Sequence, residues 1–81
     1  MKHDAKCRIT KANGTVYVGG VANDMYHGEG RLERQDGEYY EGGFYEGHKH
    51  GKGVLKTNEY LYEGSFKNGE KHGKAKVTYY N

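Results

Sequence analysis

The sequence predicts an all-β fold, an elongated single-layer antiparallel array of β-hairpins with about seven short strands. Three observations lead to this prediction. A Tyr-x-Gly motif recurs at residues 17–19, 40–42 and 62–64, and a His-Gly pair begins ten residues after each tyrosine. Apolar residues within each copy alternate with the period of a strand. Glycine recurs every few residues and no helical apolar stripe is present, which disfavours helices.

The motif repeats with a step of 22 or 23 residues. A repeat of this length indicates stacked copies of one small unit, each of which buries its apolar face against its neighbours. We therefore expect an N-terminal tail at residues 1–4 and one repeat array at residues 5–81. The array is expected to contain a half unit and three full units, at residues 5–13, 14–36, 37–58 and 59–81.

The first strand of each unit carries two aromatic residues on one face, such as Tyr40 and Phe44, with Gly42 between them. A glycine inside a strand usually marks a bend or a close approach of another group. We expect a ring from a neighbouring strand to lie over the bare backbone of Gly42, and the same at Gly19 and Gly64. The rings would then form a continuous aromatic stripe along one face.

Two kinds of turn are predicted. Asn13-Gly14 and Asp36-Gly37 lie between units and are signals for two-residue hairpins, because both positions of such a turn have positive φ. A longer loop, such as residues 67–71, is expected between the two strands of a unit. Asp24 occupies a loop position that is glycine in the other units, and Asp tolerates the left-handed region.

These residues resemble the MORN repeat (membrane occupation and recognition nexus), whose pattern is Tyr-Glu-Gly, an aromatic residue, Asn-Gly and His-Gly-x-Gly. Residues 62–75 follow this pattern with Ala75 at the last glycine, and residues 40–53 are similar. The first unit departs from it at Val18, Val21 and Asp24. The resemblance implies an elongated β-hairpin array that serves in scaffolding, protein–protein contact or membrane-lipid association.

The composition limits the core that the chain can build. Of its 81 residues, 33% are hydrophobic, with nine tyrosines, two phenylalanines and no tryptophan. Burial is inefficient in so small a chain, so we expect the folded chain to be marginally stable alone, or to gain stability from a partner or from a copy of itself. Low hydrophobicity with many charges also favours disorder, but the regular repeat argues against it.

The sequence predicts an intracellular location. Cys7 is the single cysteine, so no internal disulfide can form. The N-terminus is not followed by the apolar stretch of a secretory signal, and no run reaches the length of a membrane span. We expect a protein that is not secreted and that lies in the cytoplasm, or at the cytoskeleton or a membrane surface.

The apolar face of the repeat is the candidate partner-binding groove. Its rings hold the sheet together by packing between units. A single layer cannot cover its own inner face, so part of the stripe is expected to stay available to a protein partner, either an extended peptide or an amphipathic helix. The groove residues are Tyr17, Tyr40, Phe44, Leu55, Tyr62 and Phe66.

Charge is unevenly distributed, with sums of +3 over residues 1–23, −5 over 24–46 and +4 over 47–81. One explanation is a solvated face on each unit. The other is a basic edge that attracts anionic phospholipid head groups, at about 1 kcal/mol per lysine. The candidate residues are Lys49, His50, Lys52, Lys67, Lys71, His72, Lys74 and Lys76. No module that reads nucleic-acid bases is recognisable.

No metal, cofactor or catalytic group is predicted. Equivalent histidines of adjacent units are expected roughly 9–10 Å apart, too far to share an ion with bonds of about 2 Å. The His-Gly pairs are instead expected to shape their loops and hydrogen-bond backbone there. Ser65, the only serine, has no Asp beside it, and Gly-Lys-Gly at 51–53 lacks the Ser/Thr of a phosphate-binding loop. A flat sheet offers no closed pocket in which to shift a carboxylate pKa.

The sequence therefore predicts a non-catalytic structural adaptor or assembly subunit that binds a protein segment along the aromatic groove. The first alternative is a peripheral module for anionic phospholipids. The second is a scaffold that self-assembles when its end strands, near Ile9 and near Tyr79, pair between copies.

Overall fold

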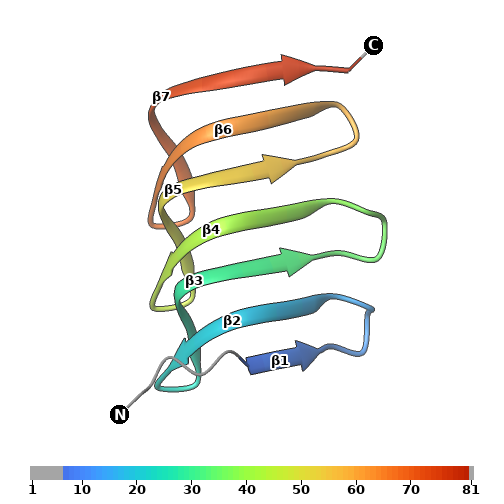
Figure 1. Ribbon diagram of the computed structural model, residues 1–81, viewed down its shortest axis with the longest axis vertical. Coiled ribbons are helices and arrows are strands. Elements are labelled where there is room, and N and C mark those ends of the chain that lie inside the picture. The colour runs from blue at the N-terminus through green and yellow to red at the C-terminus, as the bar shows by residue number, and fades with distance from the viewer. Residues whose placement is uncertain (1–6, 81) are drawn as a thin grey trace.

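The computed structural model describes residues 7–80 as one seven-stranded antiparallel sheet (Figure 1), in which the strands follow the order of the chain. The described residues form no helix, and the principal extents are 43 × 28 × 16 Å. The predicted all-β, elongated meander is confirmed. The strands are β1 (Cys7–Thr10), β2 (Val16–Ala22), β3 (Met25–Glu33), β4 (Tyr39–Tyr45), β5 (His48–Lys56), β6 (Tyr60–Lys67) and β7 (Glu70–Tyr79).

Two rows of residues run in direct register across all seven strands. The small-residue row consists of Cys7, Gly19, Gly30, Gly42, Gly53, Gly64 and Ala75. The row beside it alternates aliphatic residues with tyrosines and consists of Ile9, Tyr17, Leu32, Tyr40, Leu55, Tyr62 and Val77. We call the face that carries this second row the inner face and the opposite one the outer face.

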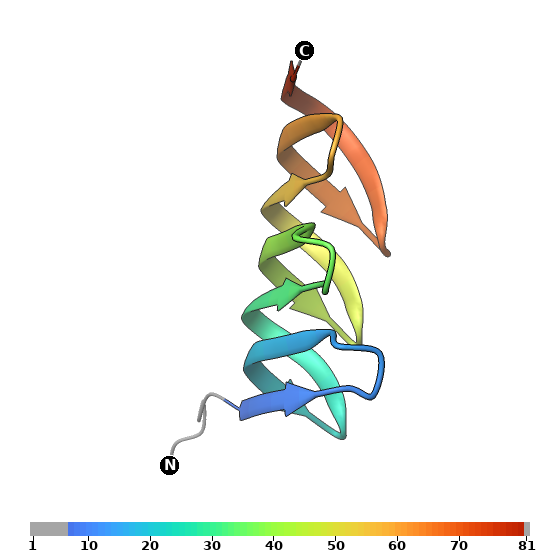
Figure 2. The same ribbon diagram turned by 90° about the vertical axis from the view of Figure 1, so that its right-hand side faces the viewer.

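Each tyrosine strand bends sharply beside its glycines. Tyr40 and Phe44 are four residues apart, which is about 13 Å along a straight strand, yet their ring centroids are 5.1 Å apart. The register between β4 and β5 shifts between Gly42 and Phe44, as at a β-bulge. The bend folds one half of the strand over the other, so the sheet curls around its inner face (Figure 2).

The rings of successive units form one continuous buried stripe. Phe44 contacts the rings of Tyr17 and Tyr40 edge-on, at 5.4 and 5.1 Å between centroids. Phe66 does the same with Tyr40 and Tyr62, at 5.1 Å in each case. These are favourable edge-to-face arrangements. The predicted aromatic stripe is therefore present and links the three full units.

The expectation that part of this stripe stays exposed is wrong for its five rings. The exposed fractions of Tyr17, Tyr40, Phe44, Tyr62 and Phe66 are 0%, 1%, 5%, 4% and 4%. A flat single layer could not cover its own face, but the bent strands place the phenylalanine half over the tyrosine half. Among the predicted groove residues, Leu55 alone is half-buried, and the other five are buried.

The rings nest over glycine, as predicted, but the receiving glycine lies on the second strand of the unit. A Cβ built on Gly53 would lie 2.4 Å from the Tyr40 hydroxyl oxygen, and one on Gly30 would lie 2.4 Å from that of Tyr17. Real Cβ atoms do not approach so closely. A side chain is excluded at Gly42 by backbone instead, because a Cβ built there would lie 2.5 Å from the Cα of Gly53.

The two kinds of turn are exchanged relative to the prediction. The connection within a unit is the two-residue hairpin, with φ of 54° at Asn23 and 64° at Asp24 in the first unit. In the first connection between units only Gly14 has positive φ, 91°, and its N–H donates to the Lys11 carbonyl at 3.0 Å. The Asn13 side chain accepts from the Thr15 N–H at 3.0 Å, which favours this wider turn. The expected left-handed conformation of Asp24 is confirmed.

The glycine of each His-Gly pair adopts a left-handed conformation, with φ of 83°, 82° and 73° at Gly28, Gly51 and Gly73. No atom lies within 4 Å of a Cβ built on these glycines, so the backbone angle rather than space requires glycine. His27 Nδ1 accepts a 3.5 Å hydrogen bond from the Glu46 N–H. This histidine thus contacts loop backbone, as expected, but the loop belongs to the next unit.

Candidate functional site

Four aliphatic residues on the inner face form what we call the inner aliphatic row: Ile9, Leu32, Leu55 and Val77. Leu32 and Leu55 are half-buried and pack against the ring cluster. Ile9 and Val77, at the two ends, are 36% and 42% exposed. Six strand spacings separate the ends, so the row is about 29 Å long. Apolar surface is therefore available along the inner face although the rings beneath it are buried.

Two surface hollows lie beside members of this row. The one at its N-terminal end has a volume of ≈ 360 Å³ and is lined by apolar atoms of Ile9, Met25 and Tyr26. Met25 is 40% exposed there. A smaller hollow of ≈ 70 Å³ lies between Leu32 and Leu55. The hollow beside Ile9 is open, and the one between Leu32 and Leu55 is too small for a drug-sized ligand. Both suit the side chains of a macromolecular partner better than a small molecule.

Cationic side chains cover the tyrosine rings on the inner face. The Lys49 ammonium lies 5.5 Å from the Tyr40 ring centroid, and that of Lys71 lies 5.3 Å from the Tyr62 centroid. In the first unit Tyr26 takes this place and stacks flat on Tyr17, with 3.9 Å between centroids. Burial lowers the pKa of Lys49 below its ordinary value, and the nearby Arg34 charge lowers it further.

The inner-face placement of Lys49 and Lys71 divides the predicted basic edge. Lys49 pairs directly with Phe44 across the hairpin, and Lys71 pairs with Phe66, so each lysine shares the face of a buried ring. The eight predicted basic residues therefore do not form one patch. Alignment of the units could have shown this, because both lysines occupy the position of Tyr26.

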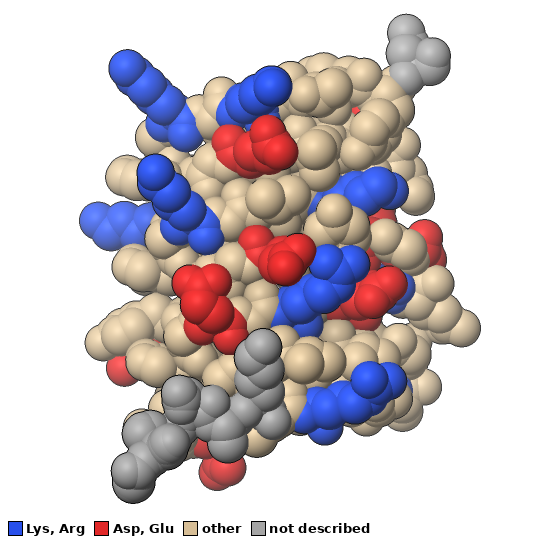
Figure 3. Space-filling view, in the orientation of Figure 1, with Lys and Arg blue, Asp and Glu red and all other residues tan. Residues whose placement is uncertain are grey.

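The outer face carries further charges in a mixed arrangement. Lys52 and Lys74 line an open hollow of ≈ 550 Å³ together with three carboxylates, those of Glu29, Glu41 and Glu63. The face presented in Figure 3 likewise shows Lys and Arg side chains interleaved with Asp and Glu. The positive potential of the lysines is thus reduced by the acidic neighbours over the middle of this face.

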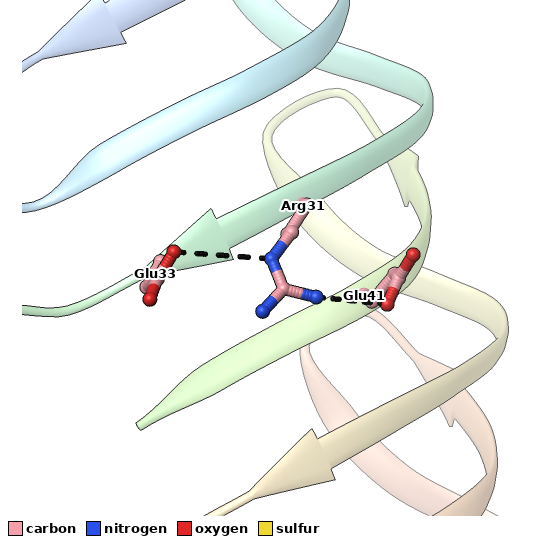
Figure 4. A network of polar contacts seen from close by, with 3 residues as sticks. All are labelled: Arg31, Glu33 and Glu41. Carbon is pink, nitrogen blue, oxygen red and sulfur yellow. Dashed lines mark hydrogen bonds and ion pairs between the residues drawn. The ribbon is translucent and has the colours of Figure 1, made fainter. Parts of the chain in front are cut away.

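One row of the outer face contains an ion-pair network. Arg31 Nη1 donates to Glu41 Oε1 at 3.0 Å across the β3–β4 pair, and its Nε lies 3.9 Å from Glu33 Oε1 (Figure 4). The guanidinium also lies over the Tyr39 ring, 4.1 Å from its centroid. We call this row the outer charged row; it consists of Arg8, Val18, Arg31, Glu41, Val54, Glu63 and Lys76.

Two histidines and a tyrosine form a ring cluster on the outer face. The His27 and His50 rings lie 5.2 and 5.6 Å from the ring of Tyr45. Within residues 7–80, no three or more His, Cys, Asp or Glu side chains gather as a metal site would require. Cys7 is exposed at the start of β1.

Sequence comparison agrees with this geometry. The profile of the MORN repeat family matches three consecutive segments, at residues 17–39, 40–58 and 62–81. The chain belongs to the MORN repeat family. MORN repeats are generally modules that bind proteins or lipids. A search of curated proteins found no match to this chain.

The structure explains the MORN pattern in this chain physically. The tyrosine hydroxyl donates to a backbone carbonyl three residues further on, from Tyr17 to Gly20 at 2.6 Å and from Tyr62 to Ser65 at 3.0 Å. The last glycine of the pattern gives the ring its space. Ala75 replaces that glycine in the third unit, and its Cβ lies 2.4 Å from where a Cβ on Gly64 would be. Gly64 must therefore remain glycine.

Among residues 7–80 there is no helix with the length and apolar character needed to cross a bilayer.

Proposed function

We propose that this MORN array is a non-catalytic structural adaptor that binds a protein segment along its inner face. The inner aliphatic row carries the proposal, because Leu32 and Leu55 are half-buried and Ile9 and Val77 are exposed along one line. The five buried rings serve as the floor of the groove, and they act by shaping it rather than by contact. Leu55, near the middle of the row, is the principal contact.

The spacing of the row favours a helical partner. Its members are separated by two strand spacings, roughly 9–10 Å. An α-helix rises about 10.5 Å in seven residues, so a helix that runs along the groove presents one apolar residue per heptad to each member. The hollows beside Ile9 and Leu55 would accept side chains that protrude from this helix.

The charge of the inner face favours an acidic partner. Lys49 and Lys71 lie over tyrosine rings on this face, and the Lys11 ammonium lies 5.6 Å from the Tyr26 centroid. Carboxylates that flank the apolar stripe of the helix would be attracted to these ammonium groups. The proposed partner is therefore an amphipathic helix with acidic flanks.

The test compares one substitution on each face of β5. Leu55→Glu places a carboxylate in the groove, whereas Val54→Glu places one on the outer face at the next residue; both side chains are half-buried. The probe is a synthetic 21-residue (about six helical turns) amphipathic peptide with one leucine per heptad and flanking glutamates. We expect Leu55→Glu to weaken its binding at least tenfold in calorimetry, and Val54→Glu to change it less than twofold.

A scrambled peptide of the same composition serves as the ligand control. Equal loss of binding in both variants, with circular dichroism showing both folded, would contradict the groove assignment. Binding of the scrambled peptide as tight as that of the amphipathic one would contradict the helical partner.

A second candidate function is peripheral binding to anionic phospholipid. It is favoured by exposed basic side chains of β5, β6 and β7, namely Lys52, Lys67 and Lys74 with His50 and His72. Vesicles containing phosphatidylserine test it by co-sedimentation. Lys52→Glu with Lys74→Glu should abolish sedimentation at low salt, and the control Arg8→Glu should not. Leu55→Glu separates the two functions, because it affects the peptide and not the vesicles.

A further inference from the structure

The C-terminal strand is a long edge. β7 contains ten residues, and every one of them is exposed. Its one neighbour in the described sheet is β6. The backbone groups along its other side are therefore open to pairing, and an edge of this length is a template for another strand.

The interior of the array shows which strand fits such an edge. β3 and β7 are equivalent second strands of their units, and β3 receives β4 on the corresponding side. There Leu32 lies opposite Tyr40, Arg31 opposite Glu41, and Gly30 opposite Gly42. The ion pair between Arg31 and Glu41 in Figure 4 is part of this register. Val77, Lys76 and Ala75 are the equivalents of Leu32, Arg31 and Gly30 on β7.

We infer that the free edge of β7 binds an extended segment of another protein that carries an aromatic residue, a carboxylate and a glycine in succession. The segment pairs antiparallel, with its aromatic residue opposite Val77 and its carboxylate opposite Lys76. The aromatic ring covers Val77, which is 42% exposed in the chain alone. This is binding by strand addition along the β7 edge, and Val77 is the one residue that it shares with the inner aliphatic row.

A second copy of the chain does not supply the matching strand. β1 pairs with β2 as β3 pairs with β4 and β7 with β6, so both outer strands are of the small and aliphatic type. β1 and β7 run in the same direction, because every adjacent pair of strands between them is antiparallel. Two copies stacked end to end in the orientation of the array therefore pair these strands in parallel, and with the small-residue row aligned Ile9 lies beside Val77 without a tyrosine ring. This alignment also places Arg8 beside Lys76, and like charges side by side destabilise a strand pair. The charge pattern therefore selects an acidic, aromatic strand over a copy of this chain.

The experiment uses the full chain and a capped, fluorescent peptide of residues 37–45, the sequence of the strand that pairs with β3. We expect saturable binding and slowed hydrogen exchange of the β7 amides. Lys76→Glu should weaken binding two- to fivefold. A peptide with Lys in place of Glu41 should reverse this preference and bind the Lys76→Glu chain more tightly than the original one. The matched control is Lys67→Glu, an exposed lysine on β6.

Three results would overturn the inference. They are no saturable binding up to about 1 mM peptide, slowed exchange on β1 instead of β7, and equal effects of Lys76→Glu and Lys67→Glu. A rise of mass with protein concentration in light scattering that the peptide does not reverse would assign the edge to a second copy instead. Leu55→Glu should leave the peptide affinity unchanged, so failure here is distinguishable from failure of the groove proposal.

Discussion

The Tyr40 hydroxyl donates a 2.8 Å hydrogen bond to the carbonyl of Gly43, three residues further along the same strand. In a straight strand this carbonyl would lie beyond the reach of the ring. The bond therefore requires the bend beside Gly42, and it holds the bend in place. The same bond recurs at Tyr17 and Tyr62, so the geometry that the three units share depends on the hydroxyl as well as on the ring.

Removing this hydroxyl should destabilise the fold without opening a cavity. Tyr40→Phe leaves the Gly43 carbonyl without its donor, at a cost of about 1–3 kcal/mol in the free energy of unfolding. Urea denaturation measures the change. Tyr45→Phe is the control, because the Tyr45 side chain is 50% exposed, and it should change stability by less than about 0.5 kcal/mol. Equal effects of the two substitutions would refute the role of the bond.

Gly53→Ala should destabilise the chain by about 1–3 kcal/mol, because the new Cβ would meet the Tyr40 ring. The hydroxyl oxygen and the nearest two ring carbons of Tyr40 lie 2.4–2.6 Å from that position. In a Tyr40→Leu background the same substitution should cost much less, and a double-mutant cycle by urea denaturation measures the difference. Purely additive effects would show that the ring is not what excludes a side chain at residue 53.

Gly51 provides a contrasting case on the same strand. Its φ is 82° and nothing lies within 4 Å of a Cβ built there, so strain alone opposes substitution. Gly51→Asn should be tolerated better than Gly51→Ala, since Asn enters the left-handed region more readily. Gly53→Asn should show no such advantage over Gly53→Ala. The unfolding temperatures of the four variants compare the two positions. If the Asn variant were more stable than the Ala variant at both positions, the distinction between strain at Gly51 and lack of space at Gly53 would be contradicted.

Stability should fall in alkaline solution. Burial, and secondarily the Glu29 carboxylate, raise the pKa of Tyr40 to about 12, and burial also raises the pKa of Tyr17. In the unfolded chain these phenols ionise near pH 10. The folded state therefore binds more protons above that pH, and stability decreases as the pH rises from about 10 to about 12. Denaturation midpoints between pH 8 and 12 test this, and Tyr40→Phe should flatten the decline.

The titration of Lys49 should change stability with pH in the opposite direction. Its pKa is lowered in the folded state, so the folded chain binds fewer protons there than the unfolded chain does just below the ordinary lysine pKa. The charged form destabilises the fold at neutral pH, and this effect is relieved as the pH rises through the lowered pKa. Lys49→Met should therefore raise the denaturation midpoint more at pH 7 than at pH 10. A gain that is equal at both values would contradict the burial of this ammonium group.

The Arg31–Glu41 pair should contribute little to stability in spite of its 3.0 Å contact. The two side chains are 41% and 60% exposed, and exposed pairs of this kind typically couple by about 0.2–1 kcal/mol. A double-mutant cycle of Arg31→Ala and Glu41→Ala measures the coupling, which should shrink further in 1 M salt. Coupling above about 2 kcal/mol would indicate that the outer charged row is a main source of stability.

The sequence by itself determined the strand order, the face on which each ring of the tyrosine strands lies and the left-handed conformation of Asp24. The alternation of Tyr40, Gly42 and Phe44 set the face of each residue, because side-chain direction in a strand depends only on parity. The left-handed position of Asp24 followed equally from one local backbone preference. These features are local or repeat at a fixed period, so they required no knowledge of the assembled sheet.

Only the tertiary structure decided what is buried and what is available. Tyr40 and Phe44 meet because the strand bends between them, and the bend depends on hydrogen bonds and bulges that parity does not reveal. That contact buried the predicted aromatic groove and left Leu55 and its row as the surface. The contact of the Lys49 ammonium with the Tyr40 ring likewise depends on the curled sheet. Burial is a property of the curled sheet, whereas the repeat in the sequence specifies each strand separately.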